Sequence, residues 1–303
     1  MRLRLYENFR FPLYAPFYAA HAIGAYAAED LEVELLPSPG IGFAEEELLA
    51  GSVDVIWAGP MRVMKHHETS ADSPLVCFAE VVCRDPFSLV GRRPNPNFTL
   101  SDLSRMRFAT VSEVATPWFC LQEDLRQAGL DPERLLRISD RSMAENLADL
   151  LEDRIEAVQL FEPVVEQALV SGGAHIWYEA FTRGRTSYTT FVTTRDRLAS
   201  EPEPLLRMTR AMYRTQQWIS SHSPLDLASA IGGFFPALEP RVLVGALTRY
   251  AAQGVWGRDP VLPEEGFERL ERALVSAGFI SRPIGFAKCV DNRLAAQVLS
   301  ERG

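Results

Sequence analysis

Hydrophobic and polar residues follow two different periods along the first part of the chain. Short apolar runs and strict alternation predict strands, whereas apolar residues three or four apart predict helices. Strands are expected at 2–7, 31–36, 53–58 and 74–82, with helices between them at 11–28, 43–50 and 61–68. Strand–helix alternation of this kind is typical of a mostly parallel sheet covered by helices.

A second α/β run occupies the middle of the chain. Strands are predicted at 107–111, 135–138 and 155–160, and helices at 117–128, 143–151 and 163–170. Residues 187–194, rich in Thr, Tyr, Phe and Val, predict a returning strand, and 202–277 has an almost continuous helical pattern. We therefore predict an α/β protein with a helical C-terminal region. Residues 1–87 and 188–303 would form lobe I, and 88–187 an inserted lobe II.

Two segments of the chain share one pattern. Residues 49–60 align with 151–162, and in both a polar turn precedes a buried strand. Pro60 ends the first segment, and Pro163 follows the second one place later. Proline suits the first position of a helix because its missing N–H would have no partner there. In open α/β sheets ligands bind beyond the carboxyl ends of strands, where helix N-termini direct donors at them. The repeat predicts two facing half-sites.

Composition and charge exclude several classes of function. The 303 residues carry a net charge of −9 without a compensating basic stripe, which argues against nucleic acid. No apolar run approaches the roughly 20 residues of a membrane span. The N-terminus alternates like a strand and has no secretory leader. We expect a cytoplasmic protein if Met1 is the native start, and a periplasmic or membrane-anchored one if a leader has been removed.

The residue types that most often carry catalysis are sparse. The four cysteines, Cys77, Cys83, Cys120 and Cys289, have no zinc-site spacing and are expected to be buried free thiols. With five histidines and no nucleophile or phosphate-loop motif, we assign no catalytic residue, metal ligand or cofactor.

Candidate ligand contacts lie where predicted strands end. The aromatic run after the first strand offers flat surfaces, although Phe11, Phe17 and Tyr18 are expected in the core. At 112–117, Thr116 either caps the helix or, together with Glu113, faces the cleft. The expected ligand-binding residues are Asn8, Phe9, Tyr14, Gly59, Pro60, Glu113, Thr116, Phe161, Glu162 and Tyr188.

The N-terminal motifs resemble the SsuA/THI5-like (NMT1) family. They are Asn8-Phe9, Pro12 with Pro16, Gly24-Ala25-Tyr26, Asp30-Leu31-Glu32-Val33 and Ala50-Gly51-Ser52-Val53-Asp54, and the resemblance extends to about residue 220. It implies a type II periplasmic-binding-protein fold, with two lobes, a hinge and a cleft between the lobes that captures a ligand. Most members of that family serve ABC importers of nitrate, sulfonates, taurine or thiamine pyrimidine precursors.

The resemblance implies a solute-binding protein that closes like a clamshell, with a small molecule and an ABC transporter permease as partners. The alternative is a cytosolic enzyme or ligand sensor on the same scaffold. Pyrimidine synthases of this fold use a Lys and a His, which align with Ala58 and Arg62 here. Desulfinases use a cysteine near the N-terminal helix, and this chain has none before Cys77.

Two carboxylates in one cleft would govern the choice of ligand. Glu113 and Glu162 of the second lobe are expected to lie there as acceptors, and buried like charges disfavour a small inorganic anion such as nitrate. They suit a ligand with amino or ring N–H donors. A thiamine-pyrimidine-like heteroaromatic is therefore preferred over a sulfonate.

Overall fold

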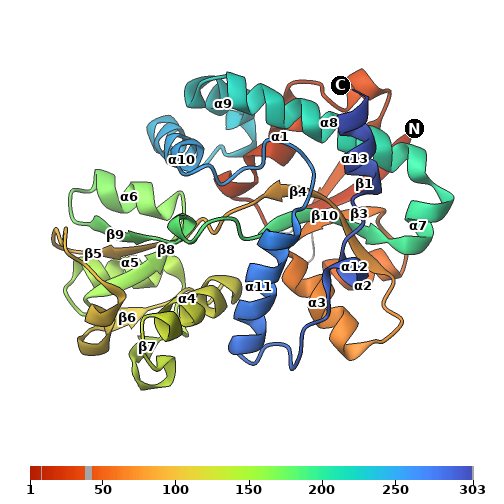
Figure 1. Ribbon diagram of the computed structural model, residues 1–303. Helices are drawn as coiled ribbons and strands as arrows, with labels where there is room; N and C mark the ends of the chain where they lie inside the picture. Colours follow the sequence, from red (N-terminus) through yellow and green to blue (C-terminus); the bar gives the residue numbers. More distant parts are fainter. Residues whose placement is uncertain (8, 38–42, 302–303) are drawn as a thin grey trace.

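The computed structural model describes residues 1–7, 9–37 and 43–301. Two five-stranded sheets stand side by side, each with helices packed on it (Figure 1). The first has the order β2-β1-β3-β10-β4 and is formed by Glu32–Pro37, Arg2–Glu7, Val55–Ala58, Thr189–Thr194 and Leu75–Val82. The second has the order β7-β6-β8-β5-β9 and is formed by Leu136–Ile138, Arg107–Ala109, Ala157–Leu160, Ser88–Gly91 and His175–Glu179.

The two sheets are built to one plan. In the first, β1 is parallel to β2 and β3, while β10 is antiparallel to β3 and β4. In the second, β6 is parallel to β7 and β8, while β5 is antiparallel to β8 and β9. The strands of the sequence repeat, β3 and β8, hold the third position in their sheets. In each sheet the strand of the repeat, β3 or β8, therefore pairs with the antiparallel strand, β10 or β5.

The α/β class and the mostly parallel sheets are confirmed, because in each sheet one strand, β10 or β5, runs against the other four. The strands that carry the chain between the sheets, β5 and β10, run antiparallel to their neighbours. Prediction missed β5, the first strand of the second sheet along the chain, and also β9. β9 is half-buried along its whole length at the edge of its sheet, so it lacks the alternation that marks a strand.

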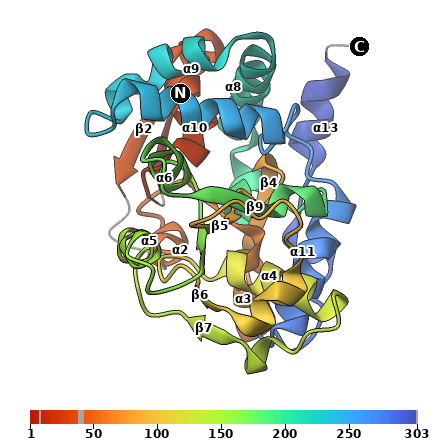
Figure 2. The same ribbon diagram turned by 90° about the vertical axis from the view of Figure 1, so that its left-hand side faces the viewer.

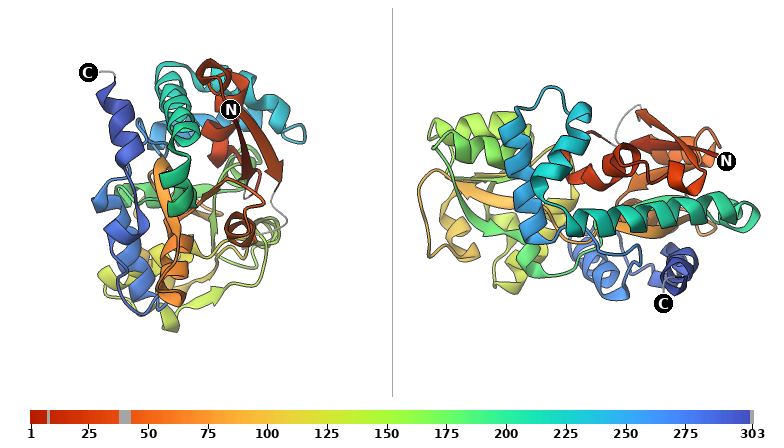
Figure 3. Two further views of the ribbon diagram at one scale, coloured as in Figure 1. Left: turned by 90° about the vertical axis from the view of Figure 1, so that its right-hand side faces the viewer. Right: turned by 90° about the horizontal axis from the view of Figure 1, so that it is seen from above.

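Helices cover both sheets, and α8 runs along one side of the first lobe with α13 beside it (Figure 3). The first lobe carries α1 Ala15–Ala22, α2 Ala44–Leu49, α3 Pro60–Thr69, α7 Arg195–Ser200, α8 Pro202–Ser221, α9 Pro224–Ile231, α10 Pro240–Gln253, α11 Glu264–Ser276, α12 Phe286–Cys289 and α13 Arg293–Ser300. The second carries α4 Thr116–Gln127, α5 Met143–Leu151 and α6 Val164–Val170. Short 3₁₀ turns are η1 Pro12–Tyr14, η2 Ala27–Glu29, η3 Leu100–Arg105, η4 Pro132–Arg134, η5 Ala180–Arg183 and η6 Gly232–Phe234.

The predicted helix at 11–28 is divided in the structure. It consists of η1, α1 and η2, and Gly24 adopts a φ of 70° after α1. α1 is buried on almost every side because it lies between the first sheet and α8. Phe17 of α1 stacks on the fully buried Trp57 of β3, with ring centroids 4.3 Å apart. All four cysteines are buried and free, as predicted.

The chain crosses between the sheets twice, and the two crossings are hydrogen-bonded to each other. Thr186 N donates to Cys83 O and Tyr188 N to Val82 O, each at 2.9 Å. Ala180 N donates to Phe87 O, also at 2.9 Å. The exact boundaries of the two lobes remain a prediction, but the crossings place a hydrogen-bonded hinge at residues 82–87 and 180–188.

Two buried ionic groups stabilise this hinge. The guanidinium of Arg183, only 8% exposed, donates to Asp85 at 2.7 Å and to Asp124 of α4 at 2.8 Å. Glu80 of β4 accepts from Ser187 Oγ at 2.7 Å and from Arg185 Nη2 at 3.1 Å. Burial raises the pKa of Glu80 to about 7.

The raised pKa of Glu80 predicts how stability depends on pH. Ionisation costs more in the folded state than in the unfolded chain, so wild type loses stability as pH rises from about 4.5 to about 7. Glu80→Gln is neutral throughout this range. The free energy of unfolding of the variant minus that of wild type should therefore be larger at pH 7.5 than at pH 5. Denaturant unfolding at both pH values measures it. The exposed Glu268→Gln is the control, and parallel profiles for Glu80→Gln and wild type would contradict this assignment.

Candidate ligand-binding site

A cavity of about 360 Å³ lies between the two lobes. It is bordered by the segments that follow β1 and β3 of the first sheet and β6 and β8 of the second, together with the hinge. The lining residues are Phe9, Leu13, Tyr14, Gly59, Met61, Arg62, Phe87, Ser112, Glu113, Val114, Ala115, Thr116, Phe161, Tyr188, Thr189 and Phe279. The site thus lies beyond the carboxyl ends of parallel strands, as the sequence repeat predicts.

Aromatic rings form the wall contributed by the first lobe. Phe9 meets Tyr14 edge-on at 5.3 Å, and Tyr14 stacks at 5.7 Å on the buried Trp57. A Cβ added to Gly59 would lie 3.0 Å from the carbonyl oxygen of Tyr188. Glycine at this position therefore lets the hinge strand pass close to the start of α3.

The loop after β6 forms much of the wall contributed by the second lobe. The N-cap of α4 is Ala115, without a side-chain cap, and the helix begins at Thr116. The capping interpretation of Thr116 is therefore wrong. Its hydroxyl donates instead to the sulfur of Met61 at 3.3 Å, which links the N-termini of α4 and α3 from opposite lobes.

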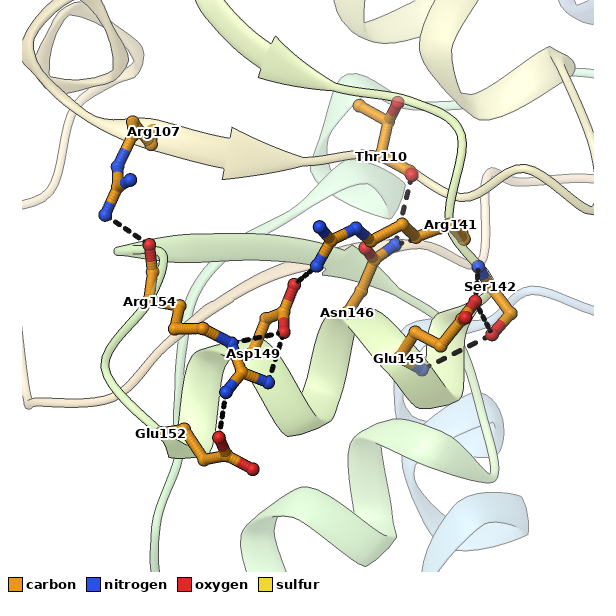
Figure 4. A network of polar contacts seen from close by, with 9 residues as sticks. All are labelled: Arg107, Thr110, Arg141, Ser142, Glu145, Asn146, Asp149, Glu152 and Arg154. Carbon is orange, nitrogen blue, oxygen red and sulfur yellow. Dashed lines mark hydrogen bonds and ion pairs between the residues drawn. The ribbon is translucent and has the colours of Figure 1, made fainter.

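Glu113 is oriented by the N-terminus of α5. Its Oε1 accepts from Met143 N at 2.8 Å, and its Oε2 is buried without a hydrogen-bond partner among the described residues. The start of α5 is fixed by the network in Figure 4, in which Asn146 Nδ2 donates to Thr110 O at 3.1 Å. Asp149, further along α5, pairs with arginines on both sides. Glu113 thus offers one unpaired carboxylate oxygen on a rigid support.

The cavity combines apolar walls with few polar groups. Among the described lining residues Arg62 is the one cation and Glu113 the one carboxylate. The Arg62 Nε lies 3.2 Å from Glu45 Oε1. Burial raises the pKa of Tyr188 well above its ordinary value and also raises the pKa of Tyr14, so both phenols stay protonated. The Tyr188 hydroxyl is buried without a partner among the described residues, which leaves it available to a ligand.

The cavity includes seven of the residues expected from the sequence: Phe9, Tyr14, Gly59, Glu113, Thr116, Phe161 and Tyr188. Pro60 does not line it, because it is the buried first residue of α3. Asn8 lies outside the described residues. Glu162 requires a larger correction.

Glu162 points away from the cavity, toward α10. Its Oε1 accepts from Arg249 Nε at 2.6 Å, and its Oε2 accepts from Glu166 N at 2.9 Å. Burial raises the pKa of Glu162, and Arg249 opposes that shift. Arg249 also pairs with Glu166 of α6. The expectation of two carboxylates in one cleft is therefore wrong for the described cavity, which Glu113 lines without Glu162.

Arg62 is the most consequential residue that sequence reasoning did not assign to the site. It lies in the first turn of α3, directly after the repeated strand, so the repeat contained a signal for it. Phe279 carried no such signal. It enters the cavity from the loop after α11 and meets Phe119 of α4 at 4.9 Å, a contact between positions far apart in sequence.

The lobes contact each other around the cavity. α10 extends from the first lobe over α6 of the second (Figures 1 and 2). Gln253 Nε2 of α10 donates to Glu179 Oε1 at 2.9 Å, and Arg126 Nη1 of α4 donates to Ser276 Oγ of α11 at 3.0 Å. The structure therefore has its two lobes drawn together. Among the described residues no helix is long and apolar enough to span a membrane, and no group of side chains has the composition of a metal site.

Comparisons with known proteins agree with this architecture. Residues 10–231 match the model of the NMT1-like family. The chain is 27% identical over 292 residues to a Bacillus subtilis protein named "Putative binding protein YtlA", covering 95% of this chain and 87% of that protein.

Solved structures show that the fold is that of periplasmic binding proteins. One is described as a "putative sulfonate ABC transporter, periplasmic sulfonate-binding protein SsuA", from Methylobacillus flagellatus KT. Its TM-score is 0.78 at 11% identity, over 100% of this chain and 94% of that one. The desulfurization enzyme DSZB gives 0.74 at 13% identity, over 100% of both chains.

The pairing of Arg249 with Glu162 predicts a large difference between two arginines of α10. Arg249→Gln leaves the 1%-exposed Glu162 without its partner, and breaking a buried ion pair costs about 3 kcal/mol or more. Arg241→Gln removes a 69%-exposed arginine from the same helix and should cost less than about 1 kcal/mol. Denaturant unfolding measures both variants. Equal losses would show that the Arg249 pair does not hold α10 against the second lobe.

Proposed function

Because the chain belongs to the NMT1-like family, we propose that it is the solute-binding component of an ABC-type importer. Its lobes would close on a small organic anion, an aromatic or heteroaromatic sulfonate-type molecule, and deliver it to a permease. This role requires export, so a periplasmic or membrane-anchored location belongs to the proposal. The likeness to a sulfonate-binding protein over the whole chain supports it.

The observation that carries the ligand class is the position of Arg62 among aromatic rings. Arg62 and the N-termini of α3 and α4 all border the cavity, and helix N-termini favour negative charge. Phe9, Tyr14 and Phe161 offer flat apolar surface to the body of the ligand. A guanidinium binds planar or tetrahedral oxyanions through paired N–H donors. A ligand with an acidic group on an aromatic ring matches both features: the acidic group suits Arg62 and the helix N-termini, and the ring suits the aromatic wall.

Glu113 supports a second candidate ligand. Its unpaired Oε2 would accept from an amino group, as the aminopyrimidine expectation requires. With Glu162 directed to Arg249, Glu113 is the one carboxylate among the described lining residues, and Arg62 lines the same cavity as the one cation. An aminopyrimidine therefore ranks below the organic anion.

The lining also bears on the enzyme alternative. The described lining residues include no cysteine, lysine or histidine, the side chains that the resemblance links with desulfinase and pyrimidine-synthase chemistry. Cys120 is buried in α4, and burial raises the pKa of its thiol to about 12, which disfavours a nucleophilic thiolate. These observations support capture without covalent chemistry.

A thermal-shift screen with benzenesulfonate, benzoate, 4-aminopyrimidine and nitrate tests the ligand class, since specific binding raises stability with ligand concentration. We expect benzenesulfonate to stabilise the protein. Arg62→Gln should weaken that binding by about tenfold or more, because a hydrogen bond to a charged group contributes roughly 1.5–3 kcal/mol.

Arg134→Gln, an equal charge change at an 86%-exposed side chain, should leave the affinity unchanged. If 4-aminopyrimidine binds instead, and Glu113→Gln weakens it while Arg62→Gln does not, the second candidate is correct. If neither variant alters the affinity of any stabilising compound, the cavity is not the binding site.

A further inference from the structure

A second pocket, of about 360 Å³, lies on the hinge and shares no lining residue with the cavity. Three arginines line it: Arg84 from the outgoing crossing, Arg185 from the returning crossing and Arg258 from the loop between α10 and α11. In a chain with a net charge of −9, three cations from three separate segments form an unusual concentration of positive charge.

Backbone hydrogen bonds fix these segments relative to one another. Cys83 N donates to Val255 O at 2.8 Å, and Gly257 N donates to Val81 O at 2.9 Å. Thr186 N donates to Cys83 O at 2.9 Å from the other side. These backbone hydrogen bonds hold the bases of the arginine side chains close together.

The positive charge of this pocket is incompletely paired. The side chains of Arg84 and Arg258 make no hydrogen bond or ion pair with the described residues. Arg185 donates through Nη2 to Glu80, but its Nε is buried without a partner. Glu80 is also engaged by Ser187, and Asp259, which lines the pocket, accepts from Val261 N at 3.0 Å. Donors therefore exceed acceptors in this pocket.

We propose that this pocket binds a multivalent oxyanion of the phosphate class, either inorganic phosphate or a phosphate ester. Guanidinium groups recognise such anions through paired N–H donors, and several of them supply the charge that a dianion requires. An anion held by Arg84 and Arg185 joins the two crossings of the hinge, and Arg258 ties it to the loop after α10. The pocket is separate from the proposed solute cavity and does not depend on what that cavity binds.

The test compares thermal unfolding in about 10 mM inorganic phosphate, in glycerol 3-phosphate and in chloride of equal ionic strength. Phosphate should raise the Tm of wild type by about 2 °C or more over chloride, because a ligand that binds the folded state stabilises it. Glycerol 3-phosphate distinguishes an ester site from one that admits only the free anion. Arg84→Ala/Arg258→Ala should abolish the shift. Arg62→Gln should retain it, which separates this pocket from the cavity.

Arg105→Ala/Arg282→Ala is the matched control, since both arginines are exposed and lie outside the pocket, and it should behave as wild type. If the Arg84/Arg258 double variant does not fold, the exposed Arg258→Gln alone should reduce phosphate affinity at least threefold in calorimetric titration. The proposal is overturned if phosphate acts no differently from chloride. It is overturned equally if the shift persists in the pocket variants.

Discussion

The arrangement of the two lobes depends on one desolvated arginine. Arg183 has lost nearly all contact with water, and a guanidinium in that position is tolerable only when carboxylates surround it. Burial alone would lower its pKa, but Asp85 and Asp124 outweigh burial and raise the pKa well above the ordinary value. Asp85 belongs to the outgoing crossing, Arg183 to the returning one and Asp124 to α4. One charge cluster thus sets the hinge and the helix whose N-terminus borders the cavity.

The same cluster explains why the hinge behaves as a defined part and not as a loose linker. Asp124 also accepts from the hydroxyl of Tyr178 at 2.8 Å, so the edge strand β9 is tied to the network. The crossings pair with each other along the backbone, and Phe87 and Tyr188, which flank them, face the cavity. A ligand that touches these residues therefore touches the element that joins the two lobes.

The fold could be predicted from the sequence to the extent that it depends on local pattern. Alternation of apolar residues located β1, and short buried runs located β3 and β8. The repeat correctly identified equivalent strands, because a buried strand followed by a helix start leaves a local signature. The direction of β5 and β10 is decided by where the chain crosses between sheets, which no local pattern records. β9 was missed because an edge strand with half-buried residues has no clear hydrophobic face.

In the candidate site too, some residues could be predicted from the local sequence and others depend on distant contacts. Positions next to strand ends, such as Gly59 and Phe161, follow from topology and were predicted. The orientation of Glu162 depends on Arg249, 87 positions away in the sequence. Phe279 comes from the loop after α11, far in sequence from the strand ends that form most of the site. Sequence reasoning identified which segments meet, but not which side chains within them are already engaged by distant partners.

The contact of α10 with α6 bears on whether the inserted lobe is an independent unit. By sequence, the inserted segment looks like an independent module placed within another. Its Glu162 and Glu166 nevertheless share a guanidinium that belongs to the surrounding chain, and Tyr250 of that chain accepts from the backbone of Glu162 at 3.0 Å. Excised alone, the module would present two adjacent carboxylates without their counter-charge. The inserted segment forms a sheet of its own, but its two carboxylates are paired with an arginine of the surrounding chain.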